Sequence, residues 1–229
     1  MMHQKIGKKQ RLYLYIVIFL LLSTLNNHKL VKSDFFNFKI SEINVFGLSE
    51  KNNLIISDNI KNIITENIFL VKKEFLTETL KKNSLVNSFE IKKIFPNKLN
   101  IKIEKTEFLA ITNINGQNYF VGSNGKLTKY ENTKKSLPYI FGLVNISKFV
   151  EFVEVVKISK YNFNSIKEIY FYPSGRWDIK NNDGQLVKLP SENLKLKLDS
   201  ISLLQKNENF KNARIIDLRF KNKIIVTDD

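Results

Sequence analysis

Apolar residues fill one long run near the start of the chain and recur afterwards in short alternating or helically spaced sets. The run covers residues 12–25 and is broken only by Ser23 and Thr24. No charge interrupts residues 12–28, and a helix of that length spans roughly 25 Å. This is short for a bilayer but feasible, because the flanking Arg11 and Lys29 can snorkel outward. We therefore predict a transmembrane anchor over residues 12–28.

Four basic residues precede this run: Lys5, Lys8, Lys9 and Arg11. The positive-inside rule keeps such a segment in the cytoplasm, so we predict a cytoplasmic tail over residues 1–11 and export of the remaining chain. A cleaved secretory signal has the same basic start and apolar run. Residues 26–29, Asn-Asn-His-Lys, offer no small-x-small cleavage site. A retained single-pass anchor is therefore favoured, and cleavage is the alternative.

The pattern after the linker predicts the order β-α-α-β-β. Ile43 and Val45 alternate with polar neighbours and are followed by Gly47, which indicates a strand. We expect one helix capped by Ser57 and a second over residues 72–82. The apolar positions of these helices are Ile60, Ile63, Ile64, Phe75, Leu76 and Leu80. A strand begins near Phe89 and Ile91, Pro96 and Asn97 turn the chain, and Leu99, Ile101 and Ile103 then alternate with Asn100, Lys102 and Glu104.

From residue 108 onwards the signals are those of an antiparallel sheet. The pairs Asn-Gly at 115–116, Asn-Gly at 124–125 and Asp-Gly at 183–184 lie between apolar segments, as tight hairpin turns do. Helical periodicity predicts two helices, over residues 147–160 and 191–205. Near the end, Ile216, Leu218 and Phe220 alternate with polar or outward positions before a turn and a last strand. A last strand often lies at a sheet edge, where it binds a partner or merely closes the sheet.

The formal net charge is +15, but its distribution argues against a nucleic-acid surface. Six basic residues and no acidic residue precede Asp34, which leaves 31 basic and 22 acidic residues, or +9, on the predicted exported part. These lysines are interspersed with acidic and polar residues. We expect an ordinary solvated surface, with attraction to anionic lipid headgroups as the alternative.

Few residue types capable of catalysis are present. The chain has no cysteine, and its only histidines are His3 and His28, so the predicted exported part has neither thiolate nor imidazole. Carboxylate-pair or Ser-Lys chemistry remains open in principle. Residues 122–126, Gly-Ser-Asn-Gly-Lys, lack the spacing of a phosphate-binding loop. We predict no catalysis, no metal, no cofactor and no small-molecule substrate.

Two motifs after the anchor resemble the POTRA domain of the FtsQ/DivIB family of bacterial cell-division proteins. They are residues 43–47, Ile-Asn-Val-Phe-Gly, and residues 94–104, Ile-Phe-Pro-Asn-Lys-Leu-Asn-Ile-Lys-Ile-Glu, with Ala110 following. The resemblance assigns residues 38–106 to a POTRA domain. POTRA domains also occur in secretion and outer-membrane assembly proteins, so a subunit of such a system is the alternative.

The second half extends the resemblance to the β domain of the same family. The matching stretches are residues 137–142, 176–179, 183–189 and 216–220, in the family's order and spacing. Phe220 replaces the usual Tyr, the predicted cytoplasmic tail is short, and the chain stops soon after the last strand. The resemblance implies an α+β protein: a transmembrane helix, the POTRA domain, and an antiparallel β domain with flanking helices over residues 107–229.

The family's role gives the remaining expectations. It implies a non-enzymatic scaffold of the divisome, single-pass in the inner membrane, with periplasmic domains concentrated at the septum. It also implies binding to FtsB and FtsL in the periplasm, contacts of the POTRA domain with other divisome proteins, and contact of the anchor with the lipid bilayer. The residues expected at the FtsB-binding edge are Arg176, Arg219, Phe220, Asn222 and Ile224.

Overall fold

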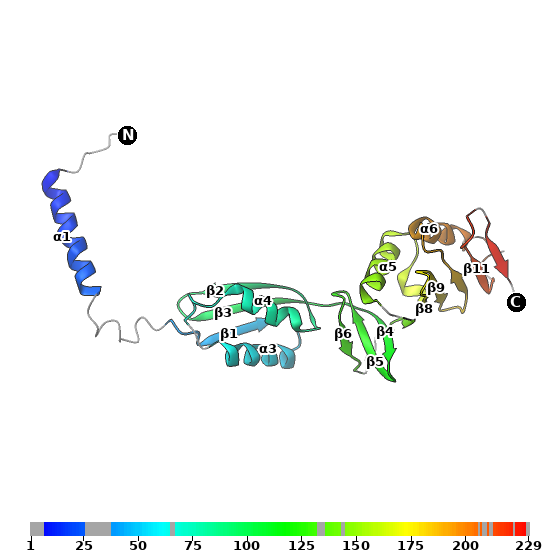
Figure 1. Cartoon of the computed structure of the whole chain (residues 1–229), viewed down its shortest axis with the longest axis horizontal. Coiled ribbons are helices and arrows are strands. Elements are labelled where there is room, and N and C mark those ends of the chain that lie inside the picture. Colours follow the sequence, from blue (N-terminus) through cyan, green and yellow to red (C-terminus); the bar gives the residue numbers. More distant parts are fainter. Residues whose placement is uncertain are drawn as a thin grey trace. The chain divides into compact units, whose positions relative to one another are not determined.

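The computed structural model describes residues 7–25, 38–64, 67–131, 136–142, 145–205, 207, 210, 213–221 and 223–227. Contacts divide the chain into two compact units. The first unit is Met1–Thr77 with Glu90–Lys102, and the second is Glu78–Phe89 with Ile103–Asp229. Figure 1 labels the helices and strands in chain order.

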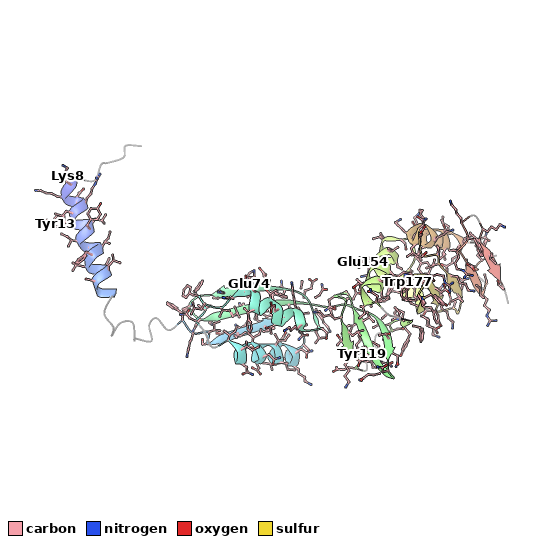
Figure 2. All side chains as sticks on the ribbon, viewed as in Figure 1. Lys8, Tyr13, Glu74, Tyr119, Glu154 and Trp177 are labelled. Carbon is pink, nitrogen blue, oxygen red and sulfur yellow. The ribbon has the colours of Figure 1, made fainter. Side chains whose placement is uncertain are left out.

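A helix forms in the region where the anchor is expected. Helix α1, Lys8–Leu25, has 18 residues, and its apolar side chains up to Leu22 are exposed; Figure 2 shows Tyr13 projecting from it. Lys8, Lys9 and Arg11 occupy its first turn. Within the described part of the chain, no helix combines the length and the apolar character needed to cross a membrane. Residues 12–25 of the expected span over residues 12–28 lie in α1, whose first turn is charged, and residues 26–28 lie outside the described residues.

The smaller sheet contains three strands in the order β1-β3-β2. Strand β1 is Glu42–Phe46, β2 is Val86–Ile94 and β3 is Lys98–Lys105. Helices α3, Glu50–Ile63, and α4, Lys73–Lys82, lie between β1 and β2 in the chain. The predicted order β-α-α-β-β is thus confirmed. Strand β1 runs parallel to β3, because two helices carry the chain back before β2 and β3 form.

The predicted register of β3 is confirmed. Leu99, Ile101 and Ile103 are buried, whereas the side chains between them are exposed or half-buried. The predicted start of the first helix is wrong. The residue that precedes α3 is Ser49, and Ser57 lies inside the helix, where its Oγ donates a hydrogen bond to the Ile43 carbonyl at 2.9 Å. Serine is common both at helix caps and at positions where its hydroxyl bonds to a nearby backbone carbonyl, so the residue type alone does not distinguish the two roles.

The larger sheet contains nine strands in the order β12-β11-β10-β9-β8-β7-β4-β5-β6. Its strands are β4 Phe108–Ile114, β5 Gln117–Gly122, β6 Leu127–Lys129, β7 Tyr139–Phe141, β8 Ile166–Phe171, β9 Trp177–Asn181, β10 Leu186–Lys188, β11 Ile215–Asp217 and β12 Ile225–Thr227. The expected antiparallel sheet is wrong in part, since β4–β7, β7–β8 and β10–β11 are parallel pairs. The sheet is mixed because a helix returns the chain between β7 and β8 and again between β10 and β11, while β5 and β6 lie between β4 and β7 in the chain.

The three predicted hairpin turns are confirmed. Asn115 and Gly116 have φ angles of 50° and 82° between β4 and β5, while Gly125 and Gly184 have φ angles of 72° and 85° in the turns after β5 and β9. Backbone with positive φ at these positions matches the twist of the flanking strands. The Asn-Gly and Asp-Gly pairs therefore predicted these three antiparallel strand pairs correctly.

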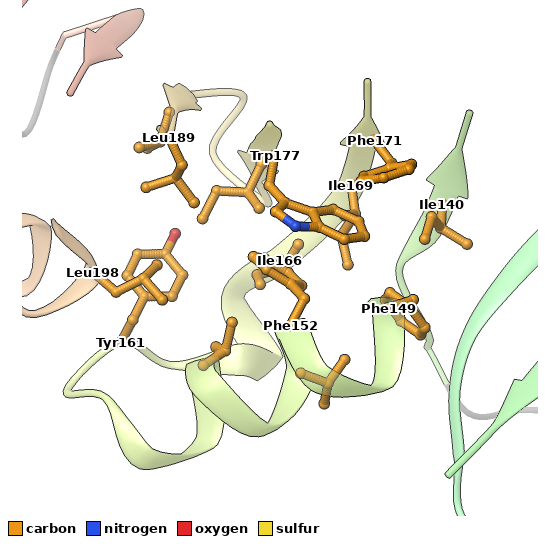
Figure 3. Packing of buried hydrophobic residues seen from close by; sticks show 14 of the residues in the cluster. Ile140, Phe149, Phe152, Tyr161, Ile166, Ile169, Phe171, Trp177, Leu189 and Leu198 are labelled. Atoms are coloured by element: carbon orange, nitrogen blue, oxygen red, sulfur yellow. The ribbon is translucent and has the colours of Figure 1, made fainter. Parts of the chain in front are cut away.

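Helices α5, Ile146–Ile158, and α6, Leu194–Leu204, cover one face of the large sheet. Each helix is the crossover of a parallel strand pair, and both crossovers advance in the same direction towards β12. Crossovers of one hand then place both helices on the same face, as Figure 1 shows for β8 and β9. The core forms there, with Phe152 stacked on Trp177 at 4.5 Å between ring centroids (Figure 3). The opposite face has no covering helix among the described residues.

Candidate partner-binding edge and open sheet face

Strand β12 is one edge of the large sheet. It pairs antiparallel with β11, with Ile216 opposite Val226, and has no second neighbour in the described chain. An edge strand presents unpaired backbone N–H and C=O groups on its outer side. The second partner of β12 can therefore come only from outside the described residues, and a strand from another protein is chemically suited to that position.

A continuous row of residues crosses the open face and ends at this edge. Residues directly opposite each other on paired strands point to the same face of a sheet. The row, from β7 to β12, is Phe141, Tyr170, Asp178, Lys188, Asp217 and Ile225. Its alternation of carboxylate, ammonium and carboxylate in the middle is electrostatically favourable, because unlike charges stand side by side.

Asp217 and Arg219 form the ion pair nearest the edge. Arg219 Nε lies 2.8 Å from Asp217 Oδ1 and 3.0 Å from Oδ2, and the Arg219 backbone N–H donates to Oδ1 at 3.1 Å. Burial by itself raises the pKa of Asp217, but the hydrogen bonds from Arg219 outweigh it and the net pKa lies below the usual value. The pair fixes the Arg219 side chain beside β12 while leaving it partly exposed.

Arg176 and Asp178 form a second, looser pair on the same face. Arg176 Nε lies 3.2 Å from Asp178 Oδ1, but neither atom has a hydrogen-bond partner among the described residues. Burial raises the pKa of Asp178, and the Arg176 charge offsets this only in part. The guanidinium carbon of Arg176 also lies 4.0 Å from the ring centre of Tyr172, a cation–π contact. This arginine is held by weaker restraints than Arg219.

The structure places the remaining predicted edge residues as follows. Phe220 and Ile224 have 46% and 43% of their surface exposed, and the Phe220 carbonyl accepts a hydrogen bond from Lys197 Nζ at 3.2 Å. They lie between β11 and β12. Asn222 lies outside the described residues. Arg219, Phe220 and Ile224 thus lie between the two edge strands, whereas Arg176 immediately precedes β9, the fourth strand from the edge.

An aromatic set continues the open face away from the edge. Phe141 stacks on Tyr170 at 5.2 Å and on Tyr139 at 6.5 Å between ring centroids. The Tyr170 hydroxyl donates to the Glu168 carboxylate, which raises the pKa of Tyr170 to about 12. A shallow pocket of about 400 Å³ lies in this region, lined by Tyr170, Tyr172, Lys180, Gly184, Leu186, Arg214 and Ile215. The face therefore offers flat aromatic surface and one hollow for a side chain.

The glycine-rich turn at residues 122–126 has a structural role. Asn124 Nδ2 donates to the carbonyls of Ser84 and Val86, each at 2.9 Å. The Gly122 N–H donates to the Lys126 carbonyl at 2.9 Å, which closes the turn. Its polar groups are thus occupied within the protein. In the described ranges no group of three or more His, Cys, Asp or Glu residues is arranged to hold a metal.

Sequence reasoning missed the two aspartates that position the arginines. Asp178 and Asp217 are each two residues away from their arginine, with Arg176 just before β9 and Arg219 just after β11. That spacing was present in the sequence as Arg-x-Asp at 176–178 and Asp-x-Arg at 217–219. The burial of both carboxylates depends on the open-face packing, which the sequence pattern does not reveal.

Two family models match the chain. A model described as the C-terminal part of the cell-division protein FtsQ/DivIB matches residues 110–219, and one described as an FtsQ-type POTRA domain matches residues 38–105. The matched regions include β1 to β3 and nearly the whole large sheet up to Arg219. The open face described above therefore lies almost entirely inside the first of these models.

Individual proteins with related sequences carry the same names. Cell division protein FtsQ of Rickettsia conorii is 28% identical over 166 residues, which cover 69% of this chain and 61% of that protein. Cell division protein DivIB of Bacillus subtilis is 30% identical over 158 residues, covering 65% and 59%. The chain thus spans about three fifths of these relatives. A solved extracytoplasmic domain of DivIB from Geobacillus stearothermophilus aligns with 45% of the chain at 18% identity and a TM-score of 0.35.

Proposed function

Because the chain belongs to the FtsQ/DivIB family of cell-division proteins, we propose that it is a non-enzymatic scaffold of the division machinery whose β12 edge accepts a strand from a partner protein. Both family models are of FtsQ type, which favours division over secretion or outer-membrane assembly. The observation that carries the proposal is the position of β12, which among the described residues has one neighbouring strand and no strand on its other side.

The chemistry around β12 defines the partner strand. The basic residues that flank β11 and precede β12 are exposed at least in part: Arg214, Arg219, Lys221 and Lys223. A partner segment carrying carboxylates is attracted to this end of the sheet, which raises the rate of association and its salt dependence. We assign this role to FtsB, with FtsL bound in the same complex. The pocket beside Tyr170 and Leu186 suits one apolar side chain of the partner.

Backbone and side chains at the edge contribute differently to binding of the partner strand. Backbone pairing contributes affinity but discriminates poorly between partner sequences, so flanking side chains must select the partner. Phe220 is exposed and aromatic, a combination typical of interface hot spots. Arg219 is already held by Asp217, so little conformational entropy is lost when it meets a carboxylate, whereas Arg176 is held less firmly by Asp178. Asn222 and Ile224 complete the proposed surface.

The compartment forms the second part of the proposal. Lys8, Lys9 and Arg11 precede the exposed apolar side chains of α1, which favours a cytoplasmic start and attachment of α1 to the inner membrane. The two units then lie in the periplasm and gather at the septum, where the first unit contacts other division proteins. A carboxyl-terminal alkaline phosphatase fusion tests the orientation. It should be active and of full length; an inactive or shortened fusion contradicts it.

Calorimetry with the periplasmic part of FtsB tests the edge. The full chain in detergent micelles should bind it, and Phe220→Ala should weaken binding by roughly thirtyfold, the effect of losing about 2 kcal/mol at a hot spot. Phe46→Ala is the matched control, because Phe46 is 53% exposed and Phe220 46%, yet Phe46 lies on β1 in the first unit, outside the sheet that contains β12. It should have little effect.

A truncation after Lys223 tests backbone pairing itself. It removes β12 and leaves β11 as the new edge, with the buried Ile216 and Leu218 retained. Circular dichroism should show a folded protein, and FtsB binding should be lost. A folded truncation that binds FtsB as tightly as the parent would place the partner elsewhere, and the first unit would become the next candidate.

A further inference from the structure

Three segments that are distant in sequence meet at one end of the first unit. The Phe38 carbonyl accepts a hydrogen bond from the Ile68 N–H at 2.8 Å, and Lys39 forms a β-bridge with Asn67. The Phe69 ring contacts Phe38 edge-on at 5.1 Å and stacks on Phe95 at 4.8 Å between centroids. The connection between α3 and α4 therefore meets both the segment by which the chain reaches the unit and the turn after β2.

The side chains at this end are apolar and exposed. Leu70 is 65% exposed, Phe69 57% and Phe95 56%, whereas Ile68 and Val71 of the same connection are buried in the core. We define the Phe69 patch as Ile63, Phe69, Leu70, Phe75 and Phe95. An open pocket of about 360 Å³ adjoins it, lined by Ile63, Ile64, Leu70, Val71, Lys72 and Phe75. The side chains of the patch stay exposed while Ile68 and Val71 beside them are buried, so the patch lies outside the core of the unit.

Lysines surround the patch. Lys39, Lys72 and Lys73 are exposed, and none of them forms an ion pair with another described residue. Lys93 donates from Nζ to the Val71 carbonyl at 2.9 Å, which keeps a fourth positive charge beside the patch. Glu74, in the first turn of α4, is the acidic residue adjacent to these lysines in the sequence. The net charge of these residues is positive, so a surface with negative charge is electrostatically complementary to the patch.

The chain length next to the patch limits what it can meet. Residues 26–37 join α1 to Phe38, and a fully extended segment of that length reaches about 40 Å at most. With α1 held in a membrane, the patch is thus confined near the bilayer surface. Aromatic and leucine side chains flanked by lysines are the residues that enter the headgroup region while their charges meet lipid phosphates.

We propose that the Phe69 patch docks the first unit onto an anionic lipid bilayer. Phe69, Leu70 and Phe95 enter the headgroup region, and Lys39, Lys72 and Lys73 contact lipid phosphates. The inference rests on the proposed membrane attachment of α1 and adds a second contact with the same membrane. Docking fixes the height of the first unit above the bilayer and so restricts the volume in which the rest of the chain can search for partners.

The absence of cysteine permits a site-specific test in the full chain. A polarity-sensitive fluorophore is attached to the variant Leu70→Cys and, as the matched control, to Leu54→Cys, since Leu54 on α3 is 59% exposed and lines a different pocket. Both proteins are reconstituted into vesicles of phosphatidylethanolamine and phosphatidylglycerol carrying nitroxide-labelled headgroups. The label at position 70 should shift its emission to the blue and be quenched, and the label at position 54 should remain in water.

Charge variants and lipid composition complete the experiment. Lys72→Glu and Lys73→Glu should each reduce the docked population relative to the undocked one by about fivefold or more, the contribution of one basic residue near an anionic surface. Vesicles of phosphatidylcholine alone should give little quenching. Equal signals at positions 70 and 54, or equal quenching in the two lipids, overturn the proposal. Quenching that rises with protein density instead of lipid charge overturns it in favour of a second copy as the occupant.

Flotation of the vesicles separates this proposal from the one on which it rests. If the protein floats with the vesicles but position 70 stays in water, α1 attaches the chain and the patch does not dock. If the protein fails to float, attachment by α1 is wrong, and the docking proposal falls with it.

Discussion

The two faces of the nine-stranded sheet are built by the same strands yet differ in almost every property. Ile169, Ile179 and Val187 point to the face covered by α5 and α6 and are fully buried. Their neighbours Tyr170, Lys180 and Lys188 point the other way and stay partly exposed. The difference shows that strand alternation assigns folding to one face and leaves the other for recognition, while the direction of the two helical crossovers decides which face is which.

The largest effect is expected when a buried apolar residue of the covered face is replaced by a charged one. Ile179→Asp places an unpaired carboxylate in the core and should destabilise the protein by about 4 kcal/mol or more, enough to unfold the second unit. Lys180→Asp, one residue further on the same strand, changes the open face and should cost about 1 kcal/mol or less. Thermal unfolding followed by circular dichroism measures both. Equal losses from the two positions would mean that the open face is also a packed interior.

In the smaller sheet, a buried and a half-buried position of β3 can be compared with less disruptive substitutions. Leu99→Ala removes buried side-chain volume from β3 and should destabilise the first unit by about 3 kcal/mol. Asn100→Ala, at the next position, should alter stability by well under 1 kcal/mol, because its side chain is only half-buried. Urea unfolding of the two variants gives the free energies. A larger effect at Asn100 would show that the register of β3 against β1 is displaced by one residue.

The two aspartates of the open face sharpen the comparison further. Asp217→Asn removes the carboxylate that holds Arg219 and should cost about 1 to 2 kcal/mol at neutral pH. Asp178→Asn should cost less or stabilise, because burial disfavours the charged form of Asp178 and its contact with Arg176 is not a hydrogen bond. Equilibrium unfolding at neutral pH compares the variants. The reverse ranking would place the stronger pair at Arg176.

The pH dependence should be the smallest effect and should have opposite signs at the two sites. The folded-state pKa of Asp217 is lowered, so its contribution is present above the unfolded pKa, about 3.9, and is lost as the pH falls through the folded pKa. The folded-state pKa of Asp178 is raised, so stability increases as the pH falls through that value. Unfolding midpoints of the parent and both asparagine variants across the acid range measure this. Asp217→Asn should weaken the acid loss, and Asp178→Asn should remove the opposing gain.

Much of the fold followed from local patterns in the sequence. Alternation located β1 and β3, and Asn-Gly or Asp-Gly pairs located three turns, because each signal concerns residues that are close in the chain. The parallel pairs were missed for the same reason. Nothing in the short strand Tyr139–Phe141 indicates that it pairs with both β4 and β8, since that choice depends on the packing of α5 over the whole sheet.

The candidate site divides in the same way. Family resemblance supplied Arg176, Arg219, Phe220 and Ile224. The structure places the last three between β11 and β12, and Arg176 just before β9, the fourth strand from that edge. The sequence alone did not supply Lys188, which stands between Asp178 and Asp217 only because β10 lies between β9 and β11. To predict which charges lie side by side across three strands, one must know the order of the strands in the sheet. A single sequence does not give that order. Whether these residues bind FtsB stays a prediction.

The three parallel pairs also set how the large sheet opens. Their partners lie 28, 29 and 29 residues apart in the chain, at Ile111 with Tyr139, Tyr139 with Glu168, and Leu186 with Ile215, whereas the hairpin pairs join neighbouring strands. Segments paired only across long loops separate more readily than hairpins do. The β11–β12 hairpin is joined to the sheet through one such pair, β10–β11, so we expect its amide protons to exchange with solvent as a unit, ahead of those of β8 and β9. A bound partner strand would then slow the exchange of these amide protons. The rate at which the hairpin opens would also limit how fast one partner is replaced by another at this edge.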